Sequence, residues 1–355
     1  MNRIDERDAM FSRMELKPGS KEYDDYYKRN PEKKDRDDEL RNKPQLLGEG
    51  TMTYHPVNST LPNSVFRFLG DIKQFSEGPV ADRKVELTPE AITKKLKLVA
   101  KYFGATDVGI TEIKDEFLYS YRGRRAEVYG DEVNLNHKYA IVYTMEMDKD
   151  MVNRAPFMEQ CLEVTKAYLD GAIIGMMLTY FLNDLGYEAR NHMDGNYLMV
   201  APLVAESAGL GQIGRAGLLI TKESGQRVRI GSVSTNLELV PDEPKDMGIP
   251  EFCEICAKCV KTCPGKAIPG TPREELDGKL RWQVSQENCY DRWRSLGTDC
   301  GICLSACPFS QGVDSELFDQ MKNDDEAKKK ILRQHEEQYG IRKFIKEPFD
   351  IMKDE

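Results

Sequence analysis

Eight cysteines lie in two closely spaced runs between residues 253 and 307. The first run reads C-x2-C-x2-C-x3-C-P, and the second ends in C-x2-C-x3-C-P. This spacing is typical of proteins that hold two [4Fe–4S] clusters, in which the last cysteine of each run ligates the other cluster. We therefore assign two ligand sets: Cys253, Cys256, Cys259 and Cys307 for the first cluster, and Cys263, Cys289, Cys300 and Cys303 for the second.

The second run departs from the regular pattern because its first ligand is displaced. Cys289 lies eleven residues before Cys300, and the intervening residues Tyr290–Asp299 are expected to form a loop that returns to the iron. Zinc also takes paired cysteines, but structural zinc sites usually separate their pairs by a longer loop. Disulfides are disfavoured by such dense spacing. The ninth cysteine, Cys161, is expected to be a buried thiol in a helix.

Length and charge set limits on the rest of the chain. A chain of 355 residues is long enough for one large and one small domain. The formal net charge of −9 argues against a phosphate-binding surface, although a local basic patch would escape this count. The sequence contains no apolar run long enough to span a membrane, and neither a signal peptide nor a twin-arginine leader is visible.

Residues 1–85 are polar, with scattered prolines and an almost entirely charged or tyrosine-containing stretch from Lys21 to Arg41. We interpret them as an N-terminal arm of short helices and loops that wraps the body. A disordered tail is the alternative. Interspersed apolar residues favour docking of the arm: Met10, Phe11, Met14, Phe66, Phe68 and Leu69.

Residues 86–249 alternate between helical and strand patterns, which predicts an α/β core. A helix begins at Thr88-Pro89 and ends at Gly104. The long helix has a predicted apolar face of Leu162, Leu169, Ile173, Met176, Met177 and Tyr180. The other expected elements are strands at 106–111, 138–147, 218–221 and 227–235, and helices at 157–185 and 202–207. A ferredoxin-like domain at 250–312 and a helical extension at 313–355 follow.

The segment AGLGQIGRAG contains the spacing G-x-G-x-x-G from Gly209, but it follows a helix instead of a strand. Basic Arg227 and Arg229 stand near where a dinucleotide fold needs an acidic residue, so a nicotinamide site is disfavoured. The glycines of the segment, Gly209, Gly211 and Gly214, permit close approach of a bulky ligand, and tight turn packing is an equally good explanation. Because a bare ferredoxin needs no such body, we expect the body to hold a cofactor that accepts electrons.

Several short motifs together resemble the corrinoid-dependent reductive dehalogenases of organohalide-respiring bacteria. They are HKYAIV at 137–142, LGYEAR at 185–190, GNY at 195–197, AGLG at 208–211, RWQ at 281–283, WR at 293–294, GTDCG at 297–301 and CPFS at 307–310. The resemblance extends from about residue 5 to about residue 312. The cysteine runs alone are common to many proteins, whereas their combination with the other motifs is specific.

The resemblance implies a nitroreductase-like α+β/α/β core that binds cobalamin, followed by the ferredoxin-like 2×[4Fe–4S] domain. In this family electrons pass through both clusters to the cobalt, and the carbon–halogen bond of an organohalide is cleaved. The expected protein is thus an oxidoreductase that acts on a chlorinated alkane or alkene. The corrinoid is held base-off, which agrees with the lack of a D-x-H-x-x-G signature in this sequence.

The resemblance also assigns site residues. Tyr168 matches the family's proton donor, and Arg229 matches the basic residue that stabilises its phenolate, with Arg227 on the same strand face as the second choice. Asn196 corresponds to a polar residue that orients the substrate or the tyrosine. Arg215 is a candidate for a corrinoid phosphate or amide, with a surface salt bridge as its alternative.

Partners and location follow from the same resemblance. Respiratory members accept electrons from a respiratory-chain donor, dock on a small membrane-anchor protein and carry a twin-arginine leader. The start MNRID looks like a mature start, so we expect the extracytoplasmic face of the membrane for a processed chain, and the cytoplasm otherwise. The alternatives are an epoxyqueuosine reductase acting on tRNA, for which the sequence lacks an evident basic face, and a non-enzymatic electron-transfer subunit.

Overall fold

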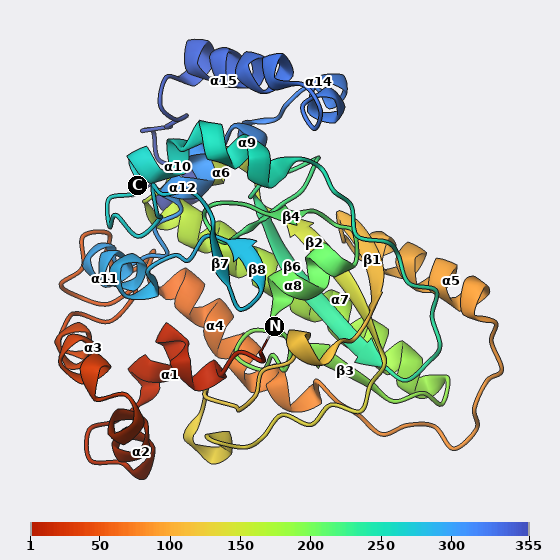
Figure 1. Ribbon diagram of the computed structural model, residues 1–355. Coiled ribbons are helices and arrows are strands. Elements are labelled where there is room, and N and C mark those ends of the chain that lie inside the picture. The colour runs from red at the N-terminus through yellow and green to blue at the C-terminus, as the bar shows by residue number, and fades with distance from the viewer. Residues whose placement is uncertain (1, 354–355) are drawn as a thin grey trace.

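The body of the molecule is built around a four-stranded sheet with the order β1-β2-β6-β3 (Figure 1). Its strands are β1 (Asp107–Glu112), β2 (Tyr139–Glu146), β6 (Val228–Thr235) and β3 (Ala189–His192). The computed structural model describes residues 2–353, so the outer ends of the predicted arm and of the C-terminal extension, residues 1 and 354–355, lie outside the described part.

All three strand pairs of this sheet are antiparallel, which corrects the α/β part of the predicted fold class to α+β. Helices and strands do alternate, but the two strands that a long helix joins, β2 and β3, are not neighbours. β6 lies between them, runs in the opposite direction and pairs with both. Strand β3 is also absent from the sequence prediction.

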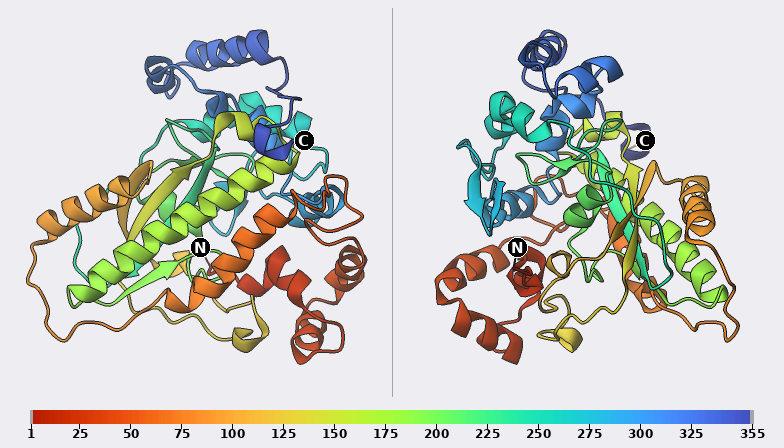
Figure 2. Two further views of the ribbon diagram at one scale, coloured as in Figure 1. Left: turned by 180° about the vertical axis from the view of Figure 1, so that it is seen from behind. Right: turned by 45° about the vertical axis from the view of Figure 1, so that its right-hand side comes forward.

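The alternation of side chains along β2 gives the body two apolar layers. Ile141 and Tyr143 pack with helices α5 (Pro89–Tyr102) and α7 (Met158–Asp184) on one face. Ala140 and Val142 pack with α8 (Ala201–Ser207) on the other, as the two-residue period of a strand requires. Figure 2 shows α7 crossing the sheet, with α4 (Thr60–Ile72) beside it.

Helix α7 lies against the sheet through its small residues. At Gly175 an added Cβ atom would collide with Asn191 of β3 and with Tyr143 of β2, so only glycine permits this close approach. The predicted apolar face is therefore partly wrong: Ile173, Met177 and Tyr180 are 45%, 42% and 47% exposed. The apolar side chains of α7 that pack with the sheet are instead Val164, Ile174, Leu178 and Leu182.

The cysteine-rich region forms a bundle of short helices. They are α9 (Ile249–Cys256), α10 (Lys258–Thr262), α11 (Gln286–Leu296), α12 (Ile302–Ala306) and α13 (Pro308–Gln311), with a hairpin of β7 (Glu274–Leu276) and β8 (Lys279–Arg281). The prediction of a loop for residues 290–299 was wrong, because most of these residues belong to helix α11. The same helix carries Cys289. Ser285 caps this helix by accepting a hydrogen bond from the Asn288 amide, and Gly297 ends it in a left-handed conformation.

The N-terminal arm contains α1 (Met10–Glu15), α2 (Lys21–Arg29) and α3 (Lys34–Arg41) and lies beside α11 (Figure 1). Arg13 is completely buried; it pairs with the equally buried Asp37 at 2.5 Å and reaches Glu287 of α11 at 2.5 Å. The Arg294 guanidinium of α11 donates to the Pro44 carbonyl at 2.7 Å. These contacts fasten the arm to the cysteine-rich region.

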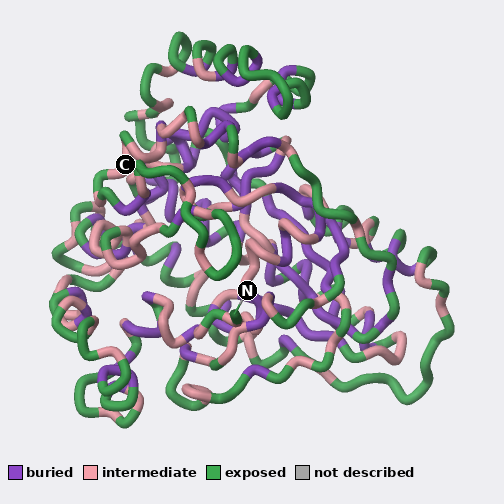
Figure 3. The backbone as a smooth tube through the Cα atoms, in the orientation of Figure 1, coloured by how far each residue is buried: buried purple, intermediate pink, exposed green. Residues whose placement is uncertain are grey.

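The C-terminal helices α14 (Ser315–Gln320) and α15 (Asp325–Tyr339) cover α9 and α13 through Phe309, Phe318 and Ile331. Three short elements complete the body: α6 (Lys149–Val152), β4 (Gln212–Ile213) and β5 (Leu219–Ile220). Buried residues concentrate in the sheet and the helices that cover it, while α2, α3 and α15 present exposed faces (Figure 3). No helix within residues 2–353 is long and apolar enough to cross a membrane.

Candidate functional site

A largely apolar cavity of about 670 Å³ lies where the arm, α7, β6 and the cysteine-rich loops meet. We call it the central cavity. The arm, α4 and α7 contribute Phe11, Leu46, Leu47, Asn63, Phe66, Cys161, Val164 and Tyr168, and the later segments contribute Asp194, Tyr197, Arg229, Trp293 and Asp299, among others. An interior of this size and character suits a bulky ligand with few charges.

The predicted pair of Tyr168 and Arg229 meets in this cavity. Tyr168 projects from α7 and Arg229 from β6, where Arg229 is paired with Met145 of β2. The guanidinium carbon of Arg229 lies 5.1 Å from the centre of the Tyr168 ring. Its Nη2 atom is 3.3 Å from Oδ2 of Asp299, so a carboxylate holds the cation beside the phenol.

Burial controls the protonation of these groups. It raises the pKa of the Tyr168 phenol above its ordinary value, and the positive charge of Arg229 acts in the opposite direction. Burial likewise raises the pKa of Asp299, again opposed by Arg229. It raises the pKa of Tyr197 well above the ordinary range. Both phenols are therefore protonated at neutral pH, as a proton donor must be.

Four cysteines line the same cavity: Cys263, Cys289, Cys300 and Cys303. Burial raises the pKa of Cys303 well above its ordinary value, and the neighbouring thiols that add to this rise are Cys300, Cys289, Cys259 and Cys263. Thiols this close and this buried ionise only when a positive partner, such as cluster iron, offsets their charge.

The other four cysteines surround a small, separate cavity beside Phe252, Phe309 and Arg215. Burial raises the pKa of Cys307 strongly, with further contributions from Cys253, Cys256 and Cys259. Among residues 2–353, no three Cys, His, Asp or Glu side chains converge closely enough to hold a single metal ion. The cysteines instead form two looser groups, the arrangement that cubane clusters need.

The five residues predicted to contact the cofactor do not line the central cavity. Arg215 lies against the Trp282 ring, with its guanidinium carbon 4.4 Å from the ring centre, and donates to the carbonyl oxygens of Cys253, Pro269 and Thr271. Arg227 is buried and bonded to the carbonyl oxygens of Ser310 and Met147. The glycines Gly209, Gly211 and Gly214 make tight backbone approaches to neighbouring segments.

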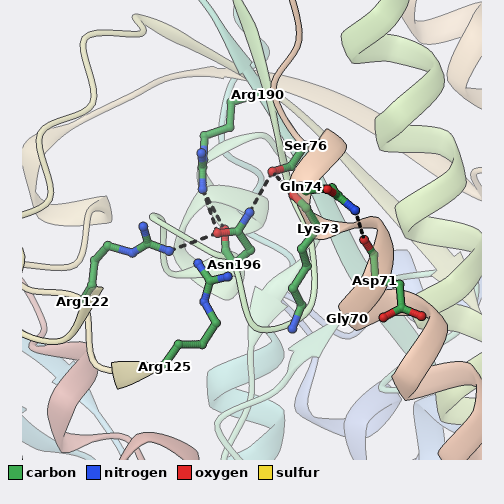
Figure 4. Close-up of a pocket in the computed structure, with 9 residues that line it drawn as sticks. All are labelled: Gly70, Asp71, Lys73, Gln74, Ser76, Arg122, Arg125, Arg190 and Asn196. Carbon is green, nitrogen blue, oxygen red and sulfur yellow. Dashed lines mark hydrogen bonds between the residues drawn. The ribbon is translucent and has the colours of Figure 1, made fainter. Parts of the chain in front are cut away.

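Asn196 occupies a neighbouring pocket instead of the central cavity (Figure 4). Its Oδ1 atom accepts hydrogen bonds from Arg190 at 2.9 Å and from Arg122 at 3.1 Å. Its amide nitrogen donates to Oγ of Ser76 at 2.8 Å. The adjacent Tyr197 is the residue of the GNY motif that lines the central cavity.

Many lining residues were not singled out as site residues from the sequence, among them Tyr197, Asp299 and Cys161. Tyr197 stands in the GNY motif beside the residue that was chosen, and Asp299 immediately precedes Cys300. Their positions within or beside a motif were the only sequence signals that could have identified Tyr197 and Asp299. Cys161, expected to be a core thiol, is buried and also lines the central cavity.

Comparison with known proteins gives a consistent picture. Residues 252–311 match the family model of the 4Fe-4S dicluster domain. The tetrachloroethene reductive dehalogenase of Sulfurospirillum multivorans is 39% identical over 179 residues, which cover 48% of this chain and 35% of that protein. The tetrachloroethene reductive dehalogenase of Desulfitobacterium hafniense is 30% identical over 273 residues, or 62% of this chain and 48% of that protein. The chain thus spans less than half the length of these curated relatives.

Solved structures share the fold over nearly the whole chain. The catabolic reductive dehalogenase NpRdhA superposes with a TM-score of 0.76 at 20% identity, covering 96% of this chain and 46% of that one. A second such structure, described as suggesting a mechanism for B12-dependent dehalogenation, gives a TM-score of 0.70 at 21% identity, with 96% of this chain and 49% of that one covered.

The alternative relative matches a smaller part of the chain. The epoxyqueuosine reductase of Lactococcus garvieae is 34% identical over 131 residues, or 36% of this chain and 36% of that protein. The dehalogenase likeness in sequence therefore covers more of the chain. The chain is a homologue of the reductive dehalogenases, has their fold and carries a 4Fe-4S dicluster domain.

Proposed function

We propose that this protein is a cobalamin-dependent reductive dehalogenase that acts on a small organohalide, either a chlorinated alkane or a chlorinated alkene. The observation that carries the proposal is the central cavity, which brings together the partly buried Tyr168, the adjacent Arg229 and four of the cysteines assigned to clusters. In the overall reaction, two electrons and one proton replace the halogen by hydrogen and release halide.

The residues around the central cavity fit a base-off corrinoid. The cavity is large and mostly apolar, and none of its described lining residues is a histidine that would replace the lower base. Bound cobalamin would supply a cobalt centre that takes up electrons and cleaves the carbon–halogen bond. The finer description of the body as a nitroreductase-like cobalamin domain belongs to this proposal.

The protein's own groups have separate roles in this scheme. We assign proton donation to the Tyr168 hydroxyl, because it is buried and protonated in the cavity. Arg229 stabilises the phenolate that remains after the proton leaves, and Asp299 keeps Arg229 in position. The apolar side chains exclude water, so that the proton comes from a side chain of the cavity.

The two cysteine groups define an order for the electrons. Cys263, Cys289, Cys300 and Cys303 face the central cavity, so their cluster is assigned as the one nearest the cofactor. The cluster of Cys253, Cys256, Cys259 and Cys307 lies outside it and receives electrons first. A respiratory-chain donor, a small membrane-anchor protein and an extracytoplasmic location on the membrane remain predictions from the family resemblance.

The decisive experiment is anaerobic reconstitution with iron, sulfide and cobalamin, followed by metal analysis and EPR. We expect about eight irons and about one cobalt per chain, a base-off cobalamin signal, and halide release from a panel of chlorinated alkanes and alkenes. Iron without cobalt would contradict the proposal and leave an electron-transfer protein. Turnover of epoxyqueuosine in tRNA, without halide release, would favour the alternative enzyme.

A further inference from the structure

A second cavity of about 490 Å³ lies beside the central cavity and has the opposite character. Four cations line it: Lys73, Arg122, Arg125 and Arg190 (Figure 4). The only acidic residue in its lining is Asp71. We call it the cationic pocket. Such a concentration of positive charge is notable in a chain whose formal net charge is −9.

The positive charge of this pocket is poorly compensated. Arg190 pairs with the exposed Glu77, and Arg122 donates to the neutral amide oxygen of Asn196. Within residues 2–353, Lys73 and Arg125 form no side-chain ion pair. Burial lowers the pKa of Lys73, and burial together with Arg190 and Arg125 lowers the pKa of Arg122. Each of these cations is thus destabilised in the absence of an anion.

Two arginines of the pocket are incompletely hydrogen-bonded. The Nε atoms of Arg122 and Arg190 are buried and have no hydrogen-bond partner. In Figure 4 the side chains of Lys73, Arg122, Arg125 and Arg190 gather around Asn196, with the Arg125 guanidinium and the Lys73 ammonium below it. Guanidinium groups match the paired oxygens of phosphate and carboxylate. We infer that the cationic pocket binds an oxyanion, the phosphate or carboxylate group of a ligand.

The position of Lys73 bears on where this anion comes from. Lys73 lines both cavities, so the two spaces adjoin at its side chain. An anion in the pocket is therefore either a separate small ion or the charged end of a ligand whose body fills the central cavity. Cobalamin has one phosphodiester among neutral amides, and this second source rests on the proposed function.

The test is titration of the cluster-loaded, corrinoid-free chain with inorganic phosphate at low ionic strength, followed by calorimetry and by ³¹P NMR. We expect one saturable site for which sulfate competes. Arg125→Gln should weaken phosphate binding by about tenfold or more, because one charge-assisted contact is lost. Arg125 is exposed, so this change leaves the packing of the body intact.

The matched control is Arg67→Gln, which removes an exposed arginine of the same helix as the pocket residue Gly70. Arg67 does not line the pocket, so its loss should leave phosphate affinity unchanged. The proposed oxyanion site is wrong if the wild-type protein shows no saturable binding of phosphate or sulfate. It is also wrong if Arg125→Gln and Arg67→Gln lose affinity equally.

Two corrinoids separate the sources of the anion. If cobalamin displaces phosphate and cobinamide, which lacks the nucleotide and its phosphodiester, does not, the pocket holds the corrinoid phosphate. If neither displaces it, the pocket binds an independent anion. Failure of both corrinoids to bind would contradict the proposed function, whereas the phosphate titration tests the oxyanion site independently of that outcome.

Discussion

At the scale of single residues, the central question is which phenol donates the proton. Tyr168→Phe removes only the hydroxyl and should lower the dehalogenation rate by about a hundredfold to ten-thousandfold, the usual contribution of general acid catalysis. Iron and cobalt contents should not change. Tyr180→Phe, at an exposed position of the same helix, serves as the control. If Tyr197→Phe abolishes turnover while Tyr168→Phe does not, the assignment is wrong.

Arg229 controls the fate of that phenol after it has lost its proton. Because burial raises the pKa of Tyr168, the phenol stays protonated through neutral pH. The enzyme should therefore lose activity only above pH 10, the ordinary pKa of a tyrosine. Removing the cation in Arg229→Gln raises this pKa further. It therefore shifts the alkaline fall to still higher pH while lowering the plateau rate by about a hundredfold. The pH profile of kcat checks this, and an alkaline fall moved to lower pH would contradict it.

At the scale of elements, a buried ion pair between Arg13 and Asp37 joins α1 to α3 within the arm. Asp37→Asn leaves Arg13 with Glu287 as its remaining carboxylate partner and should destabilise the arm by about 3 kcal/mol. Limited proteolysis should then cleave the arm much earlier than in the wild type. Lys34→Gln breaks an exposed pair with Asp38 in the same arm and should leave the rate of cleavage close to that of the wild type. Equal protection of both variants would contradict this role of Arg13 and Asp37.

Helix α15 contains a buried histidine whose two ring nitrogens lack hydrogen-bond partners. Burial, with a smaller contribution from Lys258, lowers the pKa of His335 to about 4, while Glu336 acts in the opposite direction. Unfolded protein therefore binds more protons than folded protein between about pH 6.5 and 4, so stability falls as the pH drops through this window. His335→Leu should flatten this acid dependence in urea unfolding measured at pH 7 and pH 5. An unchanged slope would show that other groups govern it.

The elements also show what sequence patterns can and cannot predict. Helices α5, α7 and α8 and strands β1, β2 and β6 were expected close to their observed bounds, because caps and apolar runs are local signals. Strand β3 was missed because its residues Asn191 and His192 are polar. Both are nevertheless buried, and His192 is bonded to Ser234 at 2.8 Å. Such partners lie far away in the sequence.

At the scale of the whole molecule, the predicted exchange of ligands between the two cysteine runs has a measurable effect. Cys263 belongs to the first run but lines the central cavity with Cys289, Cys300 and Cys303. Cys263→Ser should therefore perturb the cluster nearest the cofactor and leave the outer cluster intact. EPR of the reduced protein checks this against Cys253→Ser, which should have the reverse effect. Loss of the outer signal in Cys263→Ser would contradict the ligand assignment.

The site as a whole was only partly predictable. Residue types and a family resemblance pointed to Tyr168 and Arg229, which the structure brings together from α7 and β6. Asn196 and Arg215 were chosen for the same reasons, yet their partners are arginines in one case and backbone carbonyls in the other. Tertiary contacts decide which cavity a polar side chain faces, and a single sequence does not contain them.

The fastening of the arm to α11 has a consequence for biosynthesis. Arg13 meets Glu287, and Arg294 meets Pro44, across separations of 274 and 250 residues. On the ribosome these two contacts can therefore form only after α11 has emerged, long after their partners in the arm have been made. Phe11 and Leu47 of the arm are also walls of the central cavity. The central cavity therefore reaches its final form only after both the arm and the cysteine-rich region have been made.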